Sequence, residues 1–259
     1  MEEKKMRYAK ELLDAETAVK EIEAFTDRDE SLTVEDAYYI QLETVKLKEA
    51  QGKQVIGKKV GLTSKAMQEM LQVDEPDYGH LFDNMTVNNG DVVDTKTMVA
   101  PRVEAEIGFM LKEDLVGPHI TFLDVIMATD YVVPTLEIID SRIADWKIKL
   151  IDTVADNGSS AKVVIGDEKK KLEDVHLRTN GMILKKNGEI VATGAGAAAL
   201  GHPAEAIAWL ANKLSDFNIT LKKGELILPG ALSSALHVEA GDTIKADFST
   251  LGVVEVSFK

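Results

Sequence analysis

The sequence predicts an α+β protein, with helices at the N-terminal end and strands through most of the remainder. Residues 3–25 and 33–50 carry apolar side chains at the three- and four-residue spacing of amphipathic helices. Residues 103–109 alternate apolar and polar side chains, which is typical of a strand with one buried face. The C-terminal part contains several further strand-like segments. We therefore expect a helical lobe at residues 1–54 and a sheet-rich domain at residues 55–259.

Composition limits the classes of partner. The chain has 259 residues and is 45% hydrophobic, enough for a substantial core. Its formal net charge of −14 argues against a nucleic-acid partner. It has no cysteine, which excludes disulfides, thiolate chemistry and cysteine zinc sites, and its 5 histidines lack metal-ligand spacing. The N-terminus lacks the apolar core of a signal peptide, and no apolar run is long enough to span a membrane. We expect a cytoplasmic protein with no membrane partner.

The two expected N-terminal helices have recognisable ends. The first occupies residues 3–25, with a charged face opposite the apolar one. Thr33-Val34-Glu35-Asp36 resembles a capping box and opens the second helix. That helix is expected to continue to about Ala50, where Gly52 closes it.

Residues 55–64 are expected to form a strand that ends in a glycine turn. Ser64 would then cap a short helix at residues 65–71. Lys59 lies inside this apolar stretch, away from any obvious charged face. It is either a structural lysine whose stem packs against apolar neighbours or the cation of an active site.

Residues 74–80 read as a turn-rich loop that contains three acidic residues, among them Asp77. Most acids of this kind are solvated turn residues, but loops also carry many catalytic groups. The later polar stretch at residues 153–160 reads as a loop of small side chains. It presents hydroxyls to a carboxylate or is an ordinary turn.

Three glutamates form a candidate metal site. Glu104 and Glu106 share the polar face of the strand at residues 103–109, where two carboxylates repel each other without a cation between them. Glu137 lies between Leu136 and Ile138, and a glutamate in an apolar strand is rarely left without a partner. Oxygen ligands suit Mg²⁺ and Mn²⁺. The alternative is a solvated strand face or a structural ion network.

The remaining elements have local signals. Thr121 and Asp124 form a capping pattern for a helix at residues 121–129. Asn187-Gly188 is the strongest hairpin signal in the chain, and Pro203 opens a helix. The expected closing strands are residues 225–229, 243–248 and 252–258.

Several motifs, in order along nearly the whole chain, resemble the 2-hydroxypenta-2,4-dienoate (2-keto-4-pentenoate) hydratases and their sister family, the 4-oxalocrotonate (2-oxo-3-hexenedioate) decarboxylases. These motifs are Gly57-Lys58-Lys59-Val60-Gly61-Leu62-Thr63-Ser64-Lys65, Pro76-Asp77-Tyr78-Gly79, Glu104-Ala105-Glu106, Asp140-Ser141-Arg142, Asp152-Thr153-Val154-Ala155-Asp156-Asn157 and Gly194-Ala195-Gly196-Ala197-Ala198.

This resemblance implies the fumarylacetoacetate hydrolase-like fold, which is a mixed β-sheet roll with peripheral helices. The roll would be the catalytic domain at residues 55–259. By matching position, the divalent metal, Mg²⁺ or Mn²⁺, would be held by Glu104, Glu106 and Glu137. Lys59 and Asp77 would be the acid/base groups, and Ser159 and Ser160 would border the substrate carboxylate.

The resemblance also implies a function in the meta-cleavage of catechols. We expect a lyase that hydrates 2-hydroxypenta-2,4-dienoate, because Pro76-Asp77-Tyr78-Gly79 and Asp145-Trp146-Lys147-Ile148-Lys149 look like the hydratases. The alternative is a 4-oxalocrotonate decarboxylase, which Glu11-Leu12-Leu13-Asp14-Ala15-Glu16 and Leu177-Arg178-Thr179 resemble more closely. Leu228-Pro229-Gly230 departs from both, which usually place a small hydroxyl residue before the glycine.

The expected partners follow from this resemblance. The substrate would be a small anionic 2-oxo or 2-hydroxy acid. The chain would form a homo-oligomer and could associate with a sister enzyme of the pathway. The non-enzyme alternative is an inactive partner subunit in such a complex.

Overall fold

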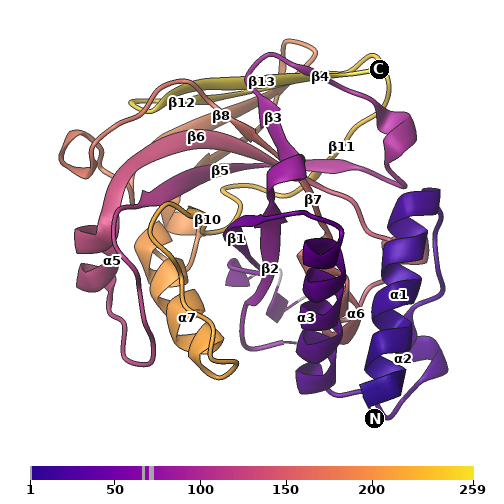
Figure 1. Cartoon of the computed structure of the whole chain (residues 1–259). Coiled ribbons are helices and arrows are strands. Elements are labelled where there is room, and N and C mark those ends of the chain that lie inside the picture. Colours follow the sequence, from indigo (N-terminus) through magenta and orange to yellow (C-terminus); the bar gives the residue numbers. More distant parts are fainter. Residues whose placement is uncertain (1, 66–67, 70–72) are drawn as a thin grey trace.

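The computed structural model describes residues 2–65, 68–69 and 73–259. In these ranges the strands form two sheets, one of eight strands and one of five, that lie one above the other with helices below and beside them (Figure 1). The strands are β1 (Val55–Gly61), β2 (Asp77–Phe82), β3 (Thr86–Asn88), β4 (Val92–Val93), β5 (Arg102–Leu111), β6 (Thr129–Ile139), β7 (Ser160–Ile165), β8 (Gly181–Lys186), β9 (Glu189–Ala195), β10 (Leu226–Leu228), β11 (Leu236–His237), β12 (Thr243–Phe248) and β13 (Gly252–Phe258).

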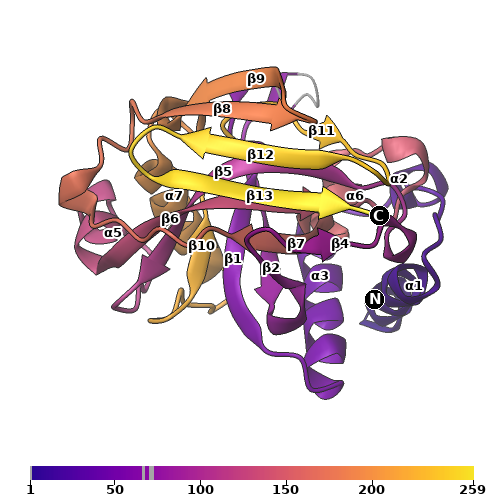
Figure 2. The same cartoon turned by 90° about the horizontal axis from the view of Figure 1, so that it is seen from above.

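The helices lie outside the two sheets. The larger sheet has the order β2-β1-β10-β5-β6-β7-β3, with β11 paired to β5, and the smaller has the order β4-β13-β12-β8-β9 (Figure 2). Both sheets mix parallel and antiparallel pairs, which confirms the expected mixed roll. The α-helices are α1 (Glu2–Ala18), α2 (Phe25–Arg28), α3 (Val34–Ala50), α5 (Phe122–Ala128), α6 (Leu150–Ala155) and α7 (Pro203–Ser215).

The two faces of β5 lie in different environments, one in the core between the sheets and the other on the opposite side of the large sheet. Val103, Ala105 and Ile107 are completely buried and belong to the same hydrophobic core as Ile244 and Phe248 of the smaller sheet. This burial follows from the period-two alternation of the strand, which turns every second side chain toward the second sheet. The remaining side chains of β5, including the two glutamates, therefore lie on the opposite face of the large sheet.

Several expected elements are confirmed with their end signals. Thr33 and Asp36 form a capping box at the start of α3, and Thr121 and Asp124 form one at the start of α5. The hairpin between β8 and β9 turns at Asn187-Gly188, where both residues have positive φ, as a type I′ turn requires. The helix at Pro203 and the closing strands β10, β12 and β13 also form where expected.

Three local expectations are wrong. The first helix ends at Ala18 rather than residue 25, because Val19 turns left-handed and Ile22 pairs with Ile143 as an isolated bridge. The expected loop at residues 74–80 becomes strand β2 from Asp77 onward, because Asp77 pairs with Gly61 of β1. The first part of the polar stretch at residues 153–160 is helical, in α6. Most of the helix expected at residues 65–71 lies outside the described residues.

We propose that residues 1–54 form a helical lobe on the sheet domain of residues 55–259. Gln41 of α3 joins the two parts, since its amide nitrogen donates to the carbonyl oxygens of Tyr78 at 2.9 Å and Val154 at 2.7 Å. Its amide oxygen faces Nδ1 of His80 at 3.0 Å. None of the helices in the described ranges combines the length and apolar character needed to cross a membrane.

The His80 side chain predicts a loss of stability in acid. Its ring is buried, and burial, with a smaller contribution from Lys58, lowers the pKa of His80 to about 3. The unfolded chain binds this proton near pH 6.5, whereas the folded chain resists it. The stability contributed by neutral His80 is therefore complete above pH 6.5 and is lost as the pH falls toward 3. The expected loss is about 2 kcal/mol by pH 5.

The measurement is urea unfolding of the wild type and of His80→Gln at several pH values between 7 and 5. The wild type should lose more free energy of unfolding over this interval than the variant, because the other titrating groups are shared. His237→Gln is the matched control, since His237 is exposed. Parallel pH profiles for the wild type and His80→Gln would contradict the prediction.

Candidate metal and substrate site

The three glutamates meet on the helix-facing side of the large sheet. Glu104 and Glu106 extend from β5, and Glu137 of the neighbouring β6 stands directly opposite Glu104 in the antiparallel register. Each residue offers a carboxylate oxygen that lies within 4.8 Å of the other two. Glu106 and Glu137 are completely buried. The strand alternation and the β5–β6 register together create this cluster.

Three of the six carboxylate oxygens in this cluster are buried without a hydrogen-bond donor among the described residues. Both oxygens of Glu137 and Oε1 of Glu106 are buried without a hydrogen bond from any residue that the structure describes. The exception is Oε2 of Glu106, which accepts a hydrogen bond from the backbone N–H of Gly230 at 2.7 Å. Buried oxygens without donors are rare in folded proteins, because the loss of hydration is not compensated. The cluster is therefore built for a positive ligand.

The electrostatics of the cluster also favour a cation. Burial and the neighbouring Glu137 raise the pKa of Glu104 to about 7. Burial and the other two carboxylates raise the pKa of Glu106 well above its ordinary value. Burial also raises the pKa of Glu137, although Lys59 opposes the shift. A divalent cation removes this repulsion, and three carboxylate ligands leave positions of an octahedral Mg²⁺ or Mn²⁺ open. The donor set fits a hard divalent metal.

Lys59 approaches the cluster from β1. Its Nζ lies 3.7 Å from Oε2 of Glu137, and the residue is only 4% exposed. Burial alone disfavours the charged form, but Glu137 and Asp77 raise the pKa of Lys59 above its ordinary value. The absence of a side chain at Gly158 leaves room for the Lys59 side chain, since a Cβ on Gly158 would lie 3.0 Å from Cε of Lys59. Lys59 is thus a buried cation beside the glutamate cluster, a position that favours the active-site interpretation over that of a structural lysine.

Asp77 stands at the start of β2, beside Lys59. Its Oδ2 accepts a hydrogen bond from the hydroxyl of Thr153 at 3.2 Å, and its Oδ1 is buried with no donor among the described residues. A Cβ on Gly61 would lie 2.1 Å from Oδ1 of Asp77 and 3.2 Å from Nζ of Lys59, so both charged groups lie over this glycine. One carboxylate oxygen is held by Thr153 and the other is free to act.

Ser159 is the last residue of a left-handed turn, and Ser160 follows it. Asn157, Gly158 and Ser159 all have positive φ, which is strained for the two residues that are not glycine. The hydroxyls of Ser159 and Ser160 are buried without a hydrogen bond to any described residue. Such hydroxyls can donate to a ligand carboxylate. The structure thus brings the serines into a buried environment next to Lys59, which Gly158 contacts.

Two side chains hold this turn in place. The side-chain amide of Asn157 forms two hydrogen bonds with the backbone of His80 in β2. Its Oδ1 accepts from the N–H of His80 at 2.8 Å, and its Nδ2 donates to the carbonyl oxygen of His80 at 2.9 Å. Arg142 lies behind the turn and donates to Oδ1 of Asp156 at 2.5 Å and to the carbonyl oxygen of Asp156 at 2.6 Å. These bonds fix the turn relative to β2, which carries Asp77.

Sequence reasoning did not find three contributors to the site. Gly230 supplies a backbone donor, and its φ of +117° is one that glycine adopts readily. Thr153 and Asn157 supply side-chain bonds across long sequence separations. The Pro229-Gly230 turn signal was visible in the sequence, but only the fold shows that the turn faces Glu106.

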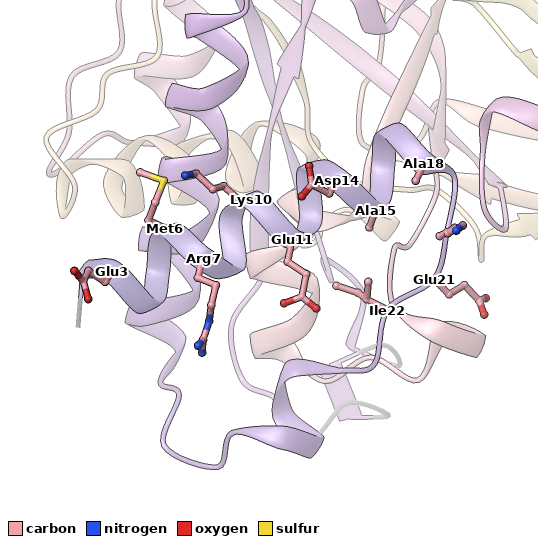
Figure 3. A pocket seen from close by; sticks show the side chains of 11 residues that line it. Glu3, Met6, Arg7, Lys10, Glu11, Asp14, Ala15, Ala18, Glu21 and Ile22 are labelled. Carbon is pink, nitrogen blue, oxygen red and sulfur yellow. The ribbon is translucent and has the colours of Figure 1, made fainter.

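A separate hollow of about 760 Å³ lies along α1 (Figure 3). It is lined by charged side chains of α1, among them Arg7, Lys10 and Glu11, and by the segment that ends at Ile22. None of the site residues described above lines it. The site chemistry therefore lies elsewhere, on the large sheet.

Comparison with known proteins gives a consistent family match. Residues 50–259 match the family model "Fumarylacetoacetate (FAA) hydrolase C-terminal". The 2-hydroxyhexa-2,4-dienoate hydratase of Comamonas testosteroni is 45% identical over 249 residues, which cover 95% of this chain and 94% of that protein. The 4-oxalocrotonate decarboxylase of Pseudomonas putida is 42% identical over 256 residues, which cover 99% of this chain and 97% of that protein.

A solved structure shares the whole fold. The 4-oxalocrotonate decarboxylase from Pseudomonas putida G7, complexed with magnesium and adipate, superposes with a TM-score of 0.98 at 40% identity. The match covers 100% of this chain and 98% of that chain. Hydratases and decarboxylases among the relatives thus resemble this chain to similar degrees.

Proposed function

Because this chain belongs to the fumarylacetoacetate hydrolase family, in the group of 2-keto-4-pentenoate hydratases and 4-oxalocrotonate decarboxylases, we propose that it hydrates 2-hydroxypenta-2,4-dienoate to 4-hydroxy-2-oxopentanoate. It is a lyase of the meta-cleavage pathway. The observation that carries the choice of hydration is Asp77, whose free Oδ1 lies beside Lys59 in a buried site. Water addition needs such a carboxylate, because water must be oriented and must lose a proton.

Glu104, Glu106 and Glu137 would hold Mg²⁺ or Mn²⁺, each through one carboxylate oxygen. When bound, the cation supplies Lewis-acid polarisation of the substrate's 2-oxygen and attraction for its carboxylate. The Pseudomonas putida G7 relative, which is 40% identical, is complexed with magnesium and adipate, and this supports the combination of a divalent metal with a carboxylate ligand. Ser159 and Ser160 would border the substrate carboxylate as hydroxyl donors.

Lys59 and Asp77 would move the protons. The substrate first loses its enol proton and gains a proton at C5, which gives a conjugated 2-oxo-3-enoate. The elements of water then add across C3 and C4, with the hydroxyl at C4 and the proton at C3. We assign Nζ of Lys59 to deliver the proton at C5 and to be reprotonated by the enol proton. We assign Oδ1 of Asp77 to take one proton from water as the oxygen approaches C4 and to return it at C3. A dication held by the glutamates would offset the carboxylates that raise the pKa of Lys59, and Lys59 would then be a better proton donor.

The second candidate is decarboxylation of 2-oxo-3-hexenedioate. It uses the same three glutamates, and the decarboxylase relatives support it. Asp77 speaks against it, because an additional anion repels the second carboxylate of a diacid. An inactive partner subunit is a weaker candidate still, since the metal cluster, Lys59 and Asp77 are all in place.

The test is steady-state turnover of both substrates by the purified protein in Mg²⁺ and in Mn²⁺. Loss of the dienoate absorbance without CO₂ release from the diacid is the expected result. Brisk CO₂ release with negligible hydration would instead identify a decarboxylase. No turnover of either substrate with metal bound would identify the inactive subunit.

The protein is also expected to form a homo-oligomer. Ile183, Ile190 and Val191 are 37%, 61% and 43% exposed on β8 and on the edge strand β9. Exposed apolar edge strands tend to pair with another chain. Light scattering at micromolar concentration should give a mass of more than one chain, and Ile190→Lys should lower it. Leu123→Lys, on the exposed face of α5, is the matched control. A monomeric mass for the wild type would contradict the prediction.

A further inference from the structure

Arg102 is the first residue of β5, and it shares a strand face with the metal cluster. Residues 102, 104 and 106 alternate with the buried Val103 and Ala105, so Arg102 and Glu104 extend from the same side of the large sheet. Arg102 thus stands at the edge of the site, one strand position beyond Glu104.

The guanidinium of Arg102 is held by an aromatic ring. Its central carbon lies 4.2 Å from the centroid of the Trp146 ring. The ring itself is anchored, because the indole Nε1–H donates to the carbonyl oxygen of Ala100 at 2.9 Å. Stacking of this kind positions a guanidinium while leaving its N–H groups free to bind in its plane.

No residue among the described ranges forms a hydrogen bond or ion pair with this guanidinium, although Arg102 is half-buried. The neighbouring cations differ in this respect. Lys147 pairs with Asp145 and Lys149 pairs with Asp27. A partly desolvated cation with five free donors favours an anion, and carboxylates match the planar fork of arginine.

The net charge of the site also favours a role for Arg102 in binding an anion. Four carboxylates face Lys59, and a divalent metal still leaves this group with a net negative charge. An anionic substrate therefore needs a further positive group near the metal. Arg102 is on the correct face to provide it.

We propose that Arg102 binds a carboxylate of the substrate at the edge of the metal site. This inference rests on the proposed function, because it takes a 2-oxo acid as the ligand. The carboxylate is either the one next to the 2-oxygen, which every candidate substrate has, or the outer one of a diacid. Trp146 is the positioning residue that holds the guanidinium for this contact.

The experiment is calorimetric titration of the Mg²⁺-loaded protein with adipate, a six-carbon dicarboxylate, and with hexanoate, its monocarboxylate counterpart. Arg102→Gln should weaken adipate binding by about 10- to 100-fold, as expected for a lost hydrogen bond to a charged group. Arg102→Lys should recover part of this loss, since it keeps the charge but not the fork. Arg7→Gln, a stacked arginine on α1 outside the site, is the matched control and should bind like the wild type.

The two probes locate the bound carboxylate. Equal weakening of adipate and hexanoate assigns Arg102 to the carboxylate that all substrates share, and weakening of adipate alone assigns it to the outer carboxylate of a diacid. Unchanged affinities in Arg102→Gln, or no metal-dependent binding of either acid by the wild type, would overturn the proposal. Failure of the proposed hydration would appear differently, as intact adipate binding without turnover of the dienoate.

Discussion

Chelation of the metal with EDTA is expected to abolish turnover, and Mg²⁺ or Mn²⁺ should restore it. The reason is the cluster of Glu104, Glu106 and Glu137, in which one carboxylate oxygen of each residue lies within 4.8 Å of the others and three buried oxygens lack hydrogen-bond donors among the described residues. Without a cation, the raised pKa values of the glutamates favour protonation over ligand binding. The measurement is the rate of dienoate loss before and after dialysis against chelator. Full activity in a sample shown by elemental analysis to be metal-free would rule out the site.

Glu106→Gln tests the same site without relying on activity. Loss of one anionic ligand should weaken Mn²⁺ binding by more than about tenfold, since loss of even an outer-sphere partner often costs this much. Metal-free stability should stay unchanged or rise, because the substitution removes one of three mutually repelling carboxylates. Glu255→Gln is the control, since Glu255 lies on β13 in the other sheet. Unchanged Mn²⁺ affinity in Glu106→Gln would exclude Glu106 as a ligand.

Asp77→Asn is expected to reduce hydration of 2-hydroxypenta-2,4-dienoate by about 10²- to 10⁴-fold, the usual contribution of a general acid–base group. Thr153 can still hold the side chain, so the loss reflects the missing base. Substrate affinity should change little, because the metal cluster and Lys59 remain. Asp74→Asn, at an exposed position just before β2, should leave the rate unchanged.

The same variant separates the two chemistries. In a decarboxylase, removal of the Asp77 charge relieves repulsion of the departing carboxylate, so turnover of 2-oxo-3-hexenedioate would be unchanged or faster. Both reactions can be followed by ultraviolet absorbance in the wild type and the variant. Unaffected hydration in Asp77→Asn, with rapid CO₂ release from the diacid, would reverse the order of the two proposed functions.

Local patterns in the sequence were enough to predict much of the secondary structure. The capping boxes at Thr33 and Thr121 and the Asn187-Gly188 turn form as expected, because their hydrogen bonds and φ values involve only neighbouring residues. The alternation in β5 also predicted that Glu104 and Glu106 share one face. The family motifs then suggested that Glu137, Lys59 and Asp77 belong with them.

Tertiary structure decided what the neighbouring residues alone could not. Asp77 was expected in a loop, but pairing with Gly61 places it in β2, and a bond from Thr153 leaves one of its oxygens free. Lys59 had two interpretations in the sequence, and the fold places its Nζ 3.7 Å from the Glu137 carboxylate of β6, which favours the active-site one. Hydrogen bonds and charges act over a few ångströms in space, whatever the separation along the chain. The sequence by itself therefore named the candidate site residues, and only the fold showed which of their atoms lie close to one another.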